Sequence, residues 1–473
     1  MRCGPEGEER IYLSSTTGMC RACGRMIDAR YVSEPGKVYL ERCCPEHGVG
    51  RSLVAESLAW YLAAMQAPVA ARPPQRVTER TGECPSSCGP CEFHAQACSL
   101  PVIPITNACD LACPICFGYS KPADNFYMSS EEFGRQLDFI VEATGGVDLI
   151  NITGGEPTLH PGLTDLVALA RRPEIGRVTV NTNGLTLARD TDLVKRLADL
   201  GAYVILSFDT CRPEACATTR GRDVTAEKRR ALENLARFDV QTTLLMVLAR
   251  GVNEEDVGPL LDLTLGTPNV RSLTIQTMTY TGQRGSTFER REHLPVDEVE
   301  RLLAGASRGR LAKADFMPLP TAHPLCYGVA YLLVGDEGRV HPLSRVLDPT
   351  TLVRHLADGY LLHPTEELET DLLLAIDRLW AEGEDQAALR TARDVIGRIF
   401  PQGRSLSVYE RQRRGEQAVK TVYVHAHMDE DTWETSRAMR CPDNVAVHAS
   451  RLVCACNYNL FHRQGDPRFW GET

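Results

Sequence analysis

Three closely spaced cysteines, Cys109, Cys113 and Cys116, are the residues of this chain best suited to chemistry. Their C-x3-C-x2-C spacing lets one loop ligate three irons of a cubane cluster, because thiolates are the soft ligands that iron–sulfur clusters require. The fourth iron would then have no protein ligand and could chelate a small molecule. A zinc knuckle or a group of buried free thiols is the alternative. The sequence that follows the loop favours the cluster.

Apolar runs with strand-like composition surround the loop and alternate with helical patterns. This order is typical of a parallel sheet, whose ligands gather at the carboxyl ends of its strands. The runs are Val102–Thr106, Leu149–Pro161, Val178–Gly184, Val204–Thr210, Thr242–Asn253 and Ser272–Met278. The cysteine loop falls at such an end. So do Gly154, Gly155, Glu156, Pro157, Asn183, Ser207, Asp209 and Gln276.

These features together resemble the radical S-adenosylmethionine (SAM) superfamily, across Pro101–Met278. The resemblance implies an α/β fold with a partial (β/α)6, TIM-like barrel. It implies that the three cysteines bind a [4Fe–4S] cluster and that SAM chelates the open iron. Gly154 and Gly155 would let the backbone approach SAM where a Cβ would clash, and Glu156 would lie beside the SAM amine. The remaining candidates for the SAM site are Phe117, Pro157, Asn183, Ser207, Asp209 and Gln276.

A second cysteine group lies near the N-terminus. Cys20 and Cys23 form a C-x2-C pair, and Cys44 follows a predicted hairpin that turns at Glu34–Lys37. Thiolates brought together by a hairpin suit tetrahedral zinc or a single rubredoxin-like iron. His47, or a cysteine from further along the chain, would be the fourth ligand.

Two more cysteine groups flank the predicted barrel. The first lies directly before it and contains Cys84, Cys88, Cys91 and Cys98. The second is split along the C-terminal part and contains Cys326, Cys441, Cys454 and Cys456. Each has enough thiols for an auxiliary cluster, and the first could instead lend a thiol to the N-terminal site. Cys211 and Cys216 are interpreted as bystanders, and Arg220 as a residue that could clamp a carboxylate or phosphate.

Composition narrows the classes of function. The 473 residues carry a net charge of −10, so a nucleic-acid backbone is not an expected partner. Eighteen cysteines argue for metal binding rather than disulfides. The first residues have no apolar signal segment, and no run reaches membrane-spanning length, so we expect a soluble, cytoplasmic protein. Basic clusters such as Lys228–Arg230 are interpreted as solvated helix faces.

The sequence suggests four regions. Residues 1–71 would form a rubredoxin-like, Cys-rich lobe that ends in a helix over Arg51–Ala71. Residues 72–100 would form an auxiliary cluster segment. Residues 101–300 would form the barrel. Residues 301–473 would form a helical cap and a C-terminal auxiliary-cluster lobe, with a hairpin that turns at Asp336–Gly338.

The order of motifs along the whole chain is TTGxCxxC, CPEHG, CPxxCGxC, the central loop, HPxC and CxYNL. It resembles the multi-cluster radical SAM family that includes the archaeal tetraether lipid synthase, members of which were once regarded as pterin methyltransferases. This resemblance implies one or two auxiliary [4Fe–4S] clusters, a rubredoxin-like iron or zinc, and a reductant such as flavodoxin or ferredoxin. The spacing around Cys441, Cys454 and Cys456 departs from the expected pattern.

The favoured hypothesis is hydrogen abstraction from an unactivated sp3 C–H of an alkyl chain or lipid by a 5′-deoxyadenosyl radical. An auxiliary cluster would then assist C–C coupling, or would donate sulfur for a C–S bond. A radical SAM methyltransferase acting on a pterin-like heterocycle is one alternative. A non-catalytic zinc-binding module is another.

Overall fold

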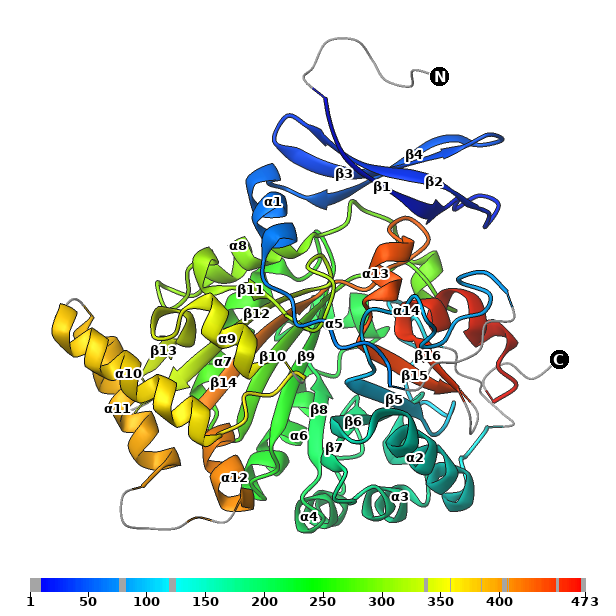
Figure 1. The fold of residues 1–473 in the computed structure, drawn as a ribbon. Coiled ribbons are helices and arrows are strands. Elements are labelled where there is room, and N and C mark those ends of the chain that lie inside the picture. The colour runs from blue at the N-terminus through cyan, green and yellow to red at the C-terminus, as the bar shows by residue number, and fades with distance from the viewer. Residues whose placement is uncertain are drawn as a thin grey trace.

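A computed structural model describes residues 10–468 except 76–81, 119–124, 336–338, 358, 384, 402–405, 407 and 448–450. The predicted hairpin turn at Asp336–Gly338 lies outside the described residues. Two sheets organise the chain, a small one above and a large one below (Figure 1). None of the helices in the described ranges is long and apolar enough to cross a membrane.

The small sheet is an antiparallel meander. Its strands are β1 (Ile11–Met19), β2 (Met26–Glu34), β3 (Lys37–Cys44) and β4 (Gly48–Ala55). The predicted hairpin is confirmed, since β2 and β3 pair up to Glu34 and Lys37. The predicted helix over Arg51–Ala71 is wrong at its start. Residues up to Ala55 pair with β3 as an edge strand, and α1 (Leu58–Gln66) begins only after Ser57, whose side chain caps it.

The large sheet has the predicted barrel strands at its centre. They are β5 (Leu100–Pro104), β6 (Val147–Thr153), β7 (Ile175–Thr182), β8 (Tyr203–Ser207), β9 (Thr242–Leu248) and β10 (Val270–Thr277). Each pairs in parallel with the next. The helices between them are α2 (Ser130–Thr144), α3 (Leu163–Leu169), α4 (Thr191–Asp199), α5 (Pro213–Arg220), α6 (Thr225–Arg237) and α7 (Val257–Gly266). The predicted α/β barrel fold is confirmed.

C-terminal strands extend this sheet at both edges. β14 (Val419–His425) pairs in parallel with β10, and β15 (Asp443–Val447) pairs in parallel with β5. Outside them lie β11 (Met317–Pro318), β12 (Tyr327–Val334), β13 (Val340–Pro342) and β16 (Arg451–Cys454), in antiparallel pairs. Residues from 301–473 therefore complete the sheet that encloses the barrel interior.

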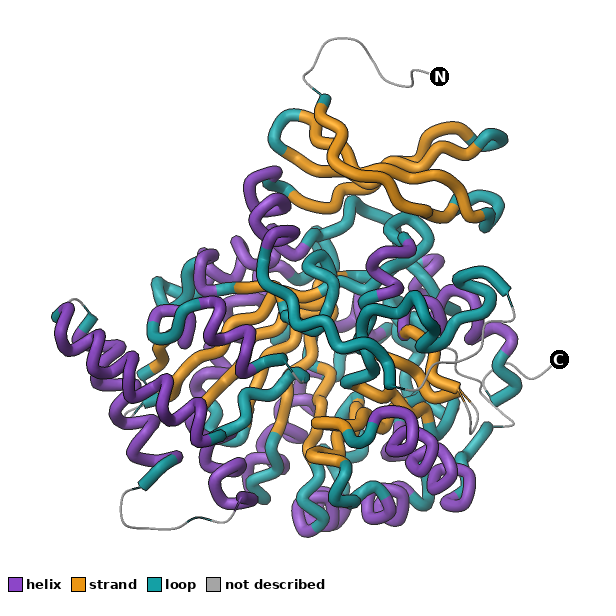
Figure 2. The backbone as a smooth tube through the Cα atoms, in the orientation of Figure 1, coloured by secondary structure: helices purple, strands orange, loops and turns teal. Residues whose placement is uncertain are grey.

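Most of the remaining helices cover the outside, and the last of them is buried. They are α8 (Val296–Ala306), α9 (Pro349–His355), α10 (Glu366–Glu382), α11 (Gln386–Ile399), α12 (Val408–Ala418), α13 (Thr435–Met439) and α14 (Ala455–Asn457). Figure 2 shows α10 and α11 as a helical pair projecting from one side, and their role as a cap stays a prediction. Apolar side chains of the barrel strands, α2–α4 and α6–α8 form one continuous core, and that core fixes the strand ends on which the site is built.

Candidate functional site

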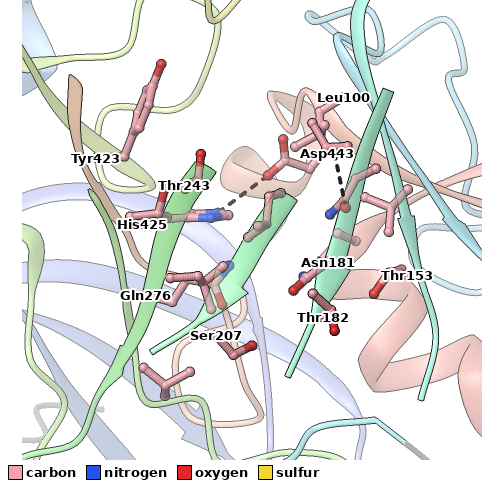
Figure 3. A pocket seen from close by; sticks show the side chains of 18 of the residues that line it. Leu100, Thr153, Asn181, Thr182, Ser207, Thr243, Gln276, Tyr423, His425 and Asp443 are labelled. Atoms are coloured by element: carbon pink, nitrogen blue, oxygen red, sulfur yellow. Dashed lines mark hydrogen bonds and ion pairs between the residues drawn. The ribbon is translucent and has the colours of Figure 1, made fainter. Parts of the chain in front are cut away.

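A cavity of about 380 Å³ fills the interior of the barrel. The three central cysteines and the Gly154–Glu156 turn line one end. Alternate residues of the strands point into it, because side chains on a strand alternate between its two faces. Figure 3 shows Asn181, Ser207, Thr243 and Gln276 facing this space from neighbouring strands.

The cysteine loop presents its thiols to this cavity. Cys109, Cys113 and Cys116 pack around Leu111 and Leu185. The Gly118 N–H points to Cys116 Sγ at 3.3 Å, and Arg220 Nη1 lies 3.7 Å from Cys113 Sγ. Burial raises the pKa of Cys109 to about 12 and also raises that of Cys116. Soft ligands at one cavity end, with cationic and N–H donors beside the sulfurs, fit an anionic iron–sulfur cluster that displaces the thiol protons.

Gly154 and Gly155 are needed for a contact within the chain. A Cβ at Gly154 would lie 2.2 Å from the Thr106 carbonyl oxygen, and one at Gly155 would lie 2.2 Å from the Ala108 carbonyl oxygen. Gly155 N–H also donates to Thr106 O at 2.7 Å. The turn is thus pressed against the strand end that leads into the cysteine loop. The structure thus gives both glycines a role in packing against the main chain, and their approach to SAM stays a prediction.

Glu156 organises the same turn. Its carboxylate accepts hydrogen bonds from Asn183 N (2.7 Å), Thr182 Oγ1 (2.6 Å) and Thr158 N (3.0 Å), and it is 1% exposed. Burial raises the pKa of Glu156, whereas these donors lower it. Pro157 starts the short helix that follows. Glu156 therefore ties β6 to β7, in addition to the predicted place beside the SAM amine.

The other predicted SAM-site residues divide into two sets. Ser207, Gln276 and Phe117 line the cavity directly. Asn183 lines it too, while its Nδ2 donates to Asp110 Oδ1 at 2.6 Å. Asp209 instead pairs with Arg220 and accepts the Val247 N–H at 2.9 Å, so it holds the guanidinium that lies beside Cys113.

The interpretation of Lys228–Arg230 as a solvated helix face holds for Arg229 and Arg230, which are exposed, but is wrong for Lys228. Lys228 is 2% exposed, and its Nζ donates to Asn183 O at 2.9 Å and to Ser207 O at 2.5 Å. Burial lowers the pKa of Lys228 to about 8. This cation joins the ends of β7 and β8 beside the cavity. One signal in the sequence could have indicated the burial of Lys228. It lies three residues before the buried Ala231 in α6, so both lie on the same face of the helix.

The N-terminal group forms a compact metal-binding set. One ligand atom each of Cys20, Cys23, Cys44 and His47 lies within 4.8 Å of the others. His47 Nδ1 is 3.4 Å from Cys44 Sγ and 3.7 Å from Cys20 Sγ. The hydrogen bond with His47 lowers the pKa of Cys44 to about 6. Three sulfurs and one imidazole nitrogen fit a tetrahedral ion such as zinc.

Cys44→Ser is expected to remove one equivalent of metal per chain from the purified protein, measured by inductively coupled plasma mass spectrometry. Serine is a hard, poorly ionised ligand in place of a thiolate. Cys43→Ser is the matched control, because Cys43 is the adjacent, exposed residue of β3 and is not in the ligand set. Equal metal content in Cys44→Ser and the unaltered protein would contradict the assignment.

The two auxiliary cysteine groups meet in space. Cys84 and Cys88 share one apolar cluster with Cys441, Cys454 and Cys456. Asn457 Nδ2 lies 3.1 Å from Cys88 Sγ and 3.9 Å from Cys84 Sγ. Cys441 and Cys454 are close enough to hydrogen-bond. Thiols that the sequence assigned to separate groups are thus pooled at the edge of the sheet, around β15 and β16.

The other auxiliary thiols lie around this pool. Cys326 Sγ accepts the Nε–H of buried Arg437 at 3.3 Å, and burial raises the pKa of Cys326 to about 11. Cys98 is buried in the main core, and Cys91 is half-buried in its loop.

Cys216 accepts the Val224 N–H at 3.4 Å, and Cys211 packs on the main core. Contacts of these kinds agree with a bystander role for Cys211 and Cys216.

Asp443 is a cavity residue that the sequence interpretation missed. Its carboxylate accepts the hydroxyl of Tyr327 at 2.6 Å and the hydroxyl of Tyr360. His425 Nε2 lies 3.5 Å from it, as the dashed line in Figure 3 shows, and His425 stacks on Tyr327 at 3.8 Å. Burial lowers the pKa of His425 well below its usual range. No local motif marks these residues, because β12, β14 and β15 meet only in the folded sheet.

Comparisons with known proteins place these features in a family context. Residues 103–264 match the radical SAM superfamily, and residues 12–56 match the HMPTM N-terminal zinc ribbon domain. The chain is 24% identical to 7,8-dihydro-6-hydroxymethylpterin dimethyltransferase of Methanocaldococcus jannaschii, over 95% of this chain and 94% of that protein. It is 32% identical to GTP 3′,8-cyclase of Chlorobaculum tepidum, over 34% of this chain and 48% of that protein.

A solved structure of Streptococcus suis SuiB bound to S-adenosylmethionine is also similar, at 18% identity and a TM-score of 0.37. The similarity covers 44% of this chain and 46% of that chain.

Proposed function

We propose, from the premise that this chain is a radical SAM superfamily enzyme, that it modifies a compact polar heterocycle held inside the barrel. A pterin is the model substrate, and methyl transfer is the proposed outcome. The observation that carries this proposal is the polar lining of the cavity. Membership of an enzyme superfamily argues against the alternative hypothesis of a non-catalytic zinc-binding module.

Polar side chains supply much of the inward face of the strands. They include Asn151, Thr153, Thr179, Asn181, Ser207, Thr243, Thr274, Gln276, Thr421 and His425. A plain alkyl chain would cover such groups without giving them hydrogen bonds, at a cost of about 1–3 kcal/mol for each one left unpaired. A heterocycle with N–H and carbonyl edges can satisfy them.

Apolar side chains occupy the rest of the wall. Val102, Leu149, Ile205 and Leu245 face the same space. Pockets that combine apolar walls with a few convergent polar groups suit flat rings, whose faces are apolar and whose edges are polar. Asp443, held by Tyr327 and Tyr360, is the carboxylate placed to accept ring N–H groups.

The predicted cofactors fit the thiol end of the cavity. Cys109, Cys113 and Cys116 would hold the [4Fe–4S] cluster, and the polar strand ends near Asn183 and Gln276 would hold SAM. Together these groups supply reductive cleavage of SAM to a 5′-deoxyadenosyl radical when bound. The surrounding strands and Tyr360, which also lines the cavity, would shield the reacting carbon from water.

The auxiliary thiols extend the proposal. Cys84, Cys88, Cys441 and Cys454 are the residues we propose for an auxiliary [4Fe–4S] cluster, because they converge in one buried, Asn457-lined patch. An external reductant, of the flavodoxin or ferredoxin kind, would supply electrons. The division of the chain at residues 71, 100 and 300 remains a proposal, with the sheet shared across the last boundary.

The test is product analysis with anaerobically reconstituted enzyme, SAM, a strong reductant and 7,8-dihydro-6-hydroxymethylpterin. Methyl transfer predicts a methylated pterin together with S-adenosylhomocysteine and 5′-deoxyadenosine, resolved by mass spectrometry. An unchanged pterin, with coupling or sulfuration of an added alkyl-chain lipid or acid, would contradict the proposal. That result would favour the C–C or C–S chemistry predicted from the sequence.

A further inference from the structure

The end of the cavity remote from the thiols is lined by α12 and is basic. Arg177 at the start of β7, Arg271 at the start of β10 and Glu416 of α12 all line the cavity there. Figure 1 shows α12 at the lower edge of the sheet, away from α14 and β16. Two guanidinium groups and one carboxylate leave this end with an excess positive charge.

Arg177 is already neutralised within the chain. Its Nε donates to Glu416 Oε1 at 2.9 Å, and its Nη2 lies 2.6 Å from the same oxygen. The Tyr203 hydroxyl donates to the other oxygen of Glu416. Such a closed, buried pair has little capacity to bind a further anion.

Arg271 has no comparable carboxylate partner among the described residues. Its Nη1 donates to the main-chain oxygen of Glu416 at 3.1 Å, and its Nε is buried without a hydrogen-bond partner in the described part of the chain. The next carboxylate, Asp239, accepts Arg413 Nη2 at 2.8 Å, where the side chain of Arg413 is 45% exposed. Burial lowers the pKa of Arg271, as expected for a cation with little counter-charge.

We propose that Arg271 is an anion-binding residue at the end of the cavity remote from the thiols, and that the substrate carries a phosphate or carboxylate group remote from its reacting carbon. This inference rests on the proposed function, in which a polar substrate occupies the barrel. One continuous cavity connects the thiols to Arg271. An anion held there would fix the distance of the ring from the thiol end and would satisfy the buried guanidinium.

The first test measures anion binding alone. Isothermal titration of the reconstituted holoenzyme with inorganic pyrophosphate is expected to show one site, and Arg271→Gln is expected to weaken it about tenfold or more. Arg271→Lys keeps the charge and should retain part of the affinity. Arg413→Gln removes a nearby cation outside the cavity and should bind pyrophosphate as the unaltered enzyme does. Equal affinity in Arg271→Gln and Arg413→Gln, or binding of an adventitious ion only, would overturn the proposal.

The second test separates this inference from the proposed function. Dissociation constants are compared for 7,8-dihydro-6-hydroxymethylpterin, its phosphate ester and the corresponding 6-carboxylate. We expect one of the two anionic ligands to bind about tenfold more tightly than the alcohol, and expect Arg271→Gln to abolish that preference without changing affinity for the alcohol. Binding of all three with equal affinity overturns the anion site alone. Failure of all three to bind, with pyrophosphate still bound through Arg271, overturns the pterin substrate and keeps the anion site.

Discussion

Replacing Cys113 by serine is expected to lower SAM cleavage by roughly 10⁴-fold or more, the scale of removing an essential catalytic group. It should also remove about four irons per chain, the content of one [4Fe–4S] cluster. Cys113 is 8% exposed and lies 3.7 Å from the Arg220 guanidinium. The Arg220 guanidinium can therefore offset the negative charge of a buried thiolate ligand at this position. A serine hydroxyl there would stay protonated and would be a hard, weak ligand for iron.

Cys216→Ser is the matched control for this experiment. Cys216 belongs to the same apolar cluster as Cys113 and is 2% exposed, so both substitutions place a hydroxyl in the same surroundings. Iron content and labile sulfide, read with Mössbauer spectra after anaerobic reconstitution, should stay unchanged in Cys216→Ser. Equal iron loss in both variants would mean that the substitution disrupts the loop. Unchanged iron in Cys113→Ser would rule out this cysteine as a ligand.

The barrel strands and the cysteine loop can be predicted from the sequence because each has a recognisable pattern within a short stretch of the chain. The C-x3-C-x2-C loop, the Gly-Gly-Glu-Pro turn and the apolar strands each have a short-range pattern. The hairpin that brings Cys23 within 4.0 Å of Cys44 also follows from a local turn. His47, left open as a fourth ligand, lies three residues after Cys44, in the short connection between β3 and β4.

Long-range pairing explains most of what the sequence did not predict. β14 and β15 join opposite edges of the barrel sheet, so Asp443 and His425 reach one point of the cavity from segments with no common motif. The same pairing brings Cys441 and Cys454 against Cys88. Register between distant strands depends on the whole core, which short-range patterns do not encode.

Electrostatic roles also depended on three-dimensional context. Glu156 is predicted to lie beside the SAM amine, which stays a prediction, and the structure adds hydrogen bonds that its carboxylate accepts from Thr182 of β7 and from the Asn183 N–H. Lys228 looked like a surface charge and instead joins two strand ends. In both cases a charged side chain is stabilised by main-chain groups that only tertiary structure brings near it.

Gly155→Ala is expected to destabilise the protein by about 3 kcal/mol, within the range for overpacking against rigid neighbours. The added Cβ would lie 2.2 Å from the Ala108 carbonyl oxygen and 2.8 Å from that of Asn107. Neither oxygen can rotate away as a side chain could. Glu156 N–H donates to the same Ala108 oxygen at 2.7 Å, so relief of the clash would break the contact between the turn and the cysteine loop.

Activity should fall further than stability alone explains. Displacing the loop by about 1 Å moves Cys109 relative to the cavity, and misplacement of that size costs about 100-fold in rate. The measurements are urea unfolding and 5′-deoxyadenosine formation. Gly134→Ala is the control, since a Cβ there in α2 meets nothing within 4 Å, and it should stabilise the protein by about 0.5–1 kcal/mol with unchanged activity. If Gly155→Ala kept full activity, the Gly155–Ala108 contact would not position the cluster loop, and the glycine would serve another purpose.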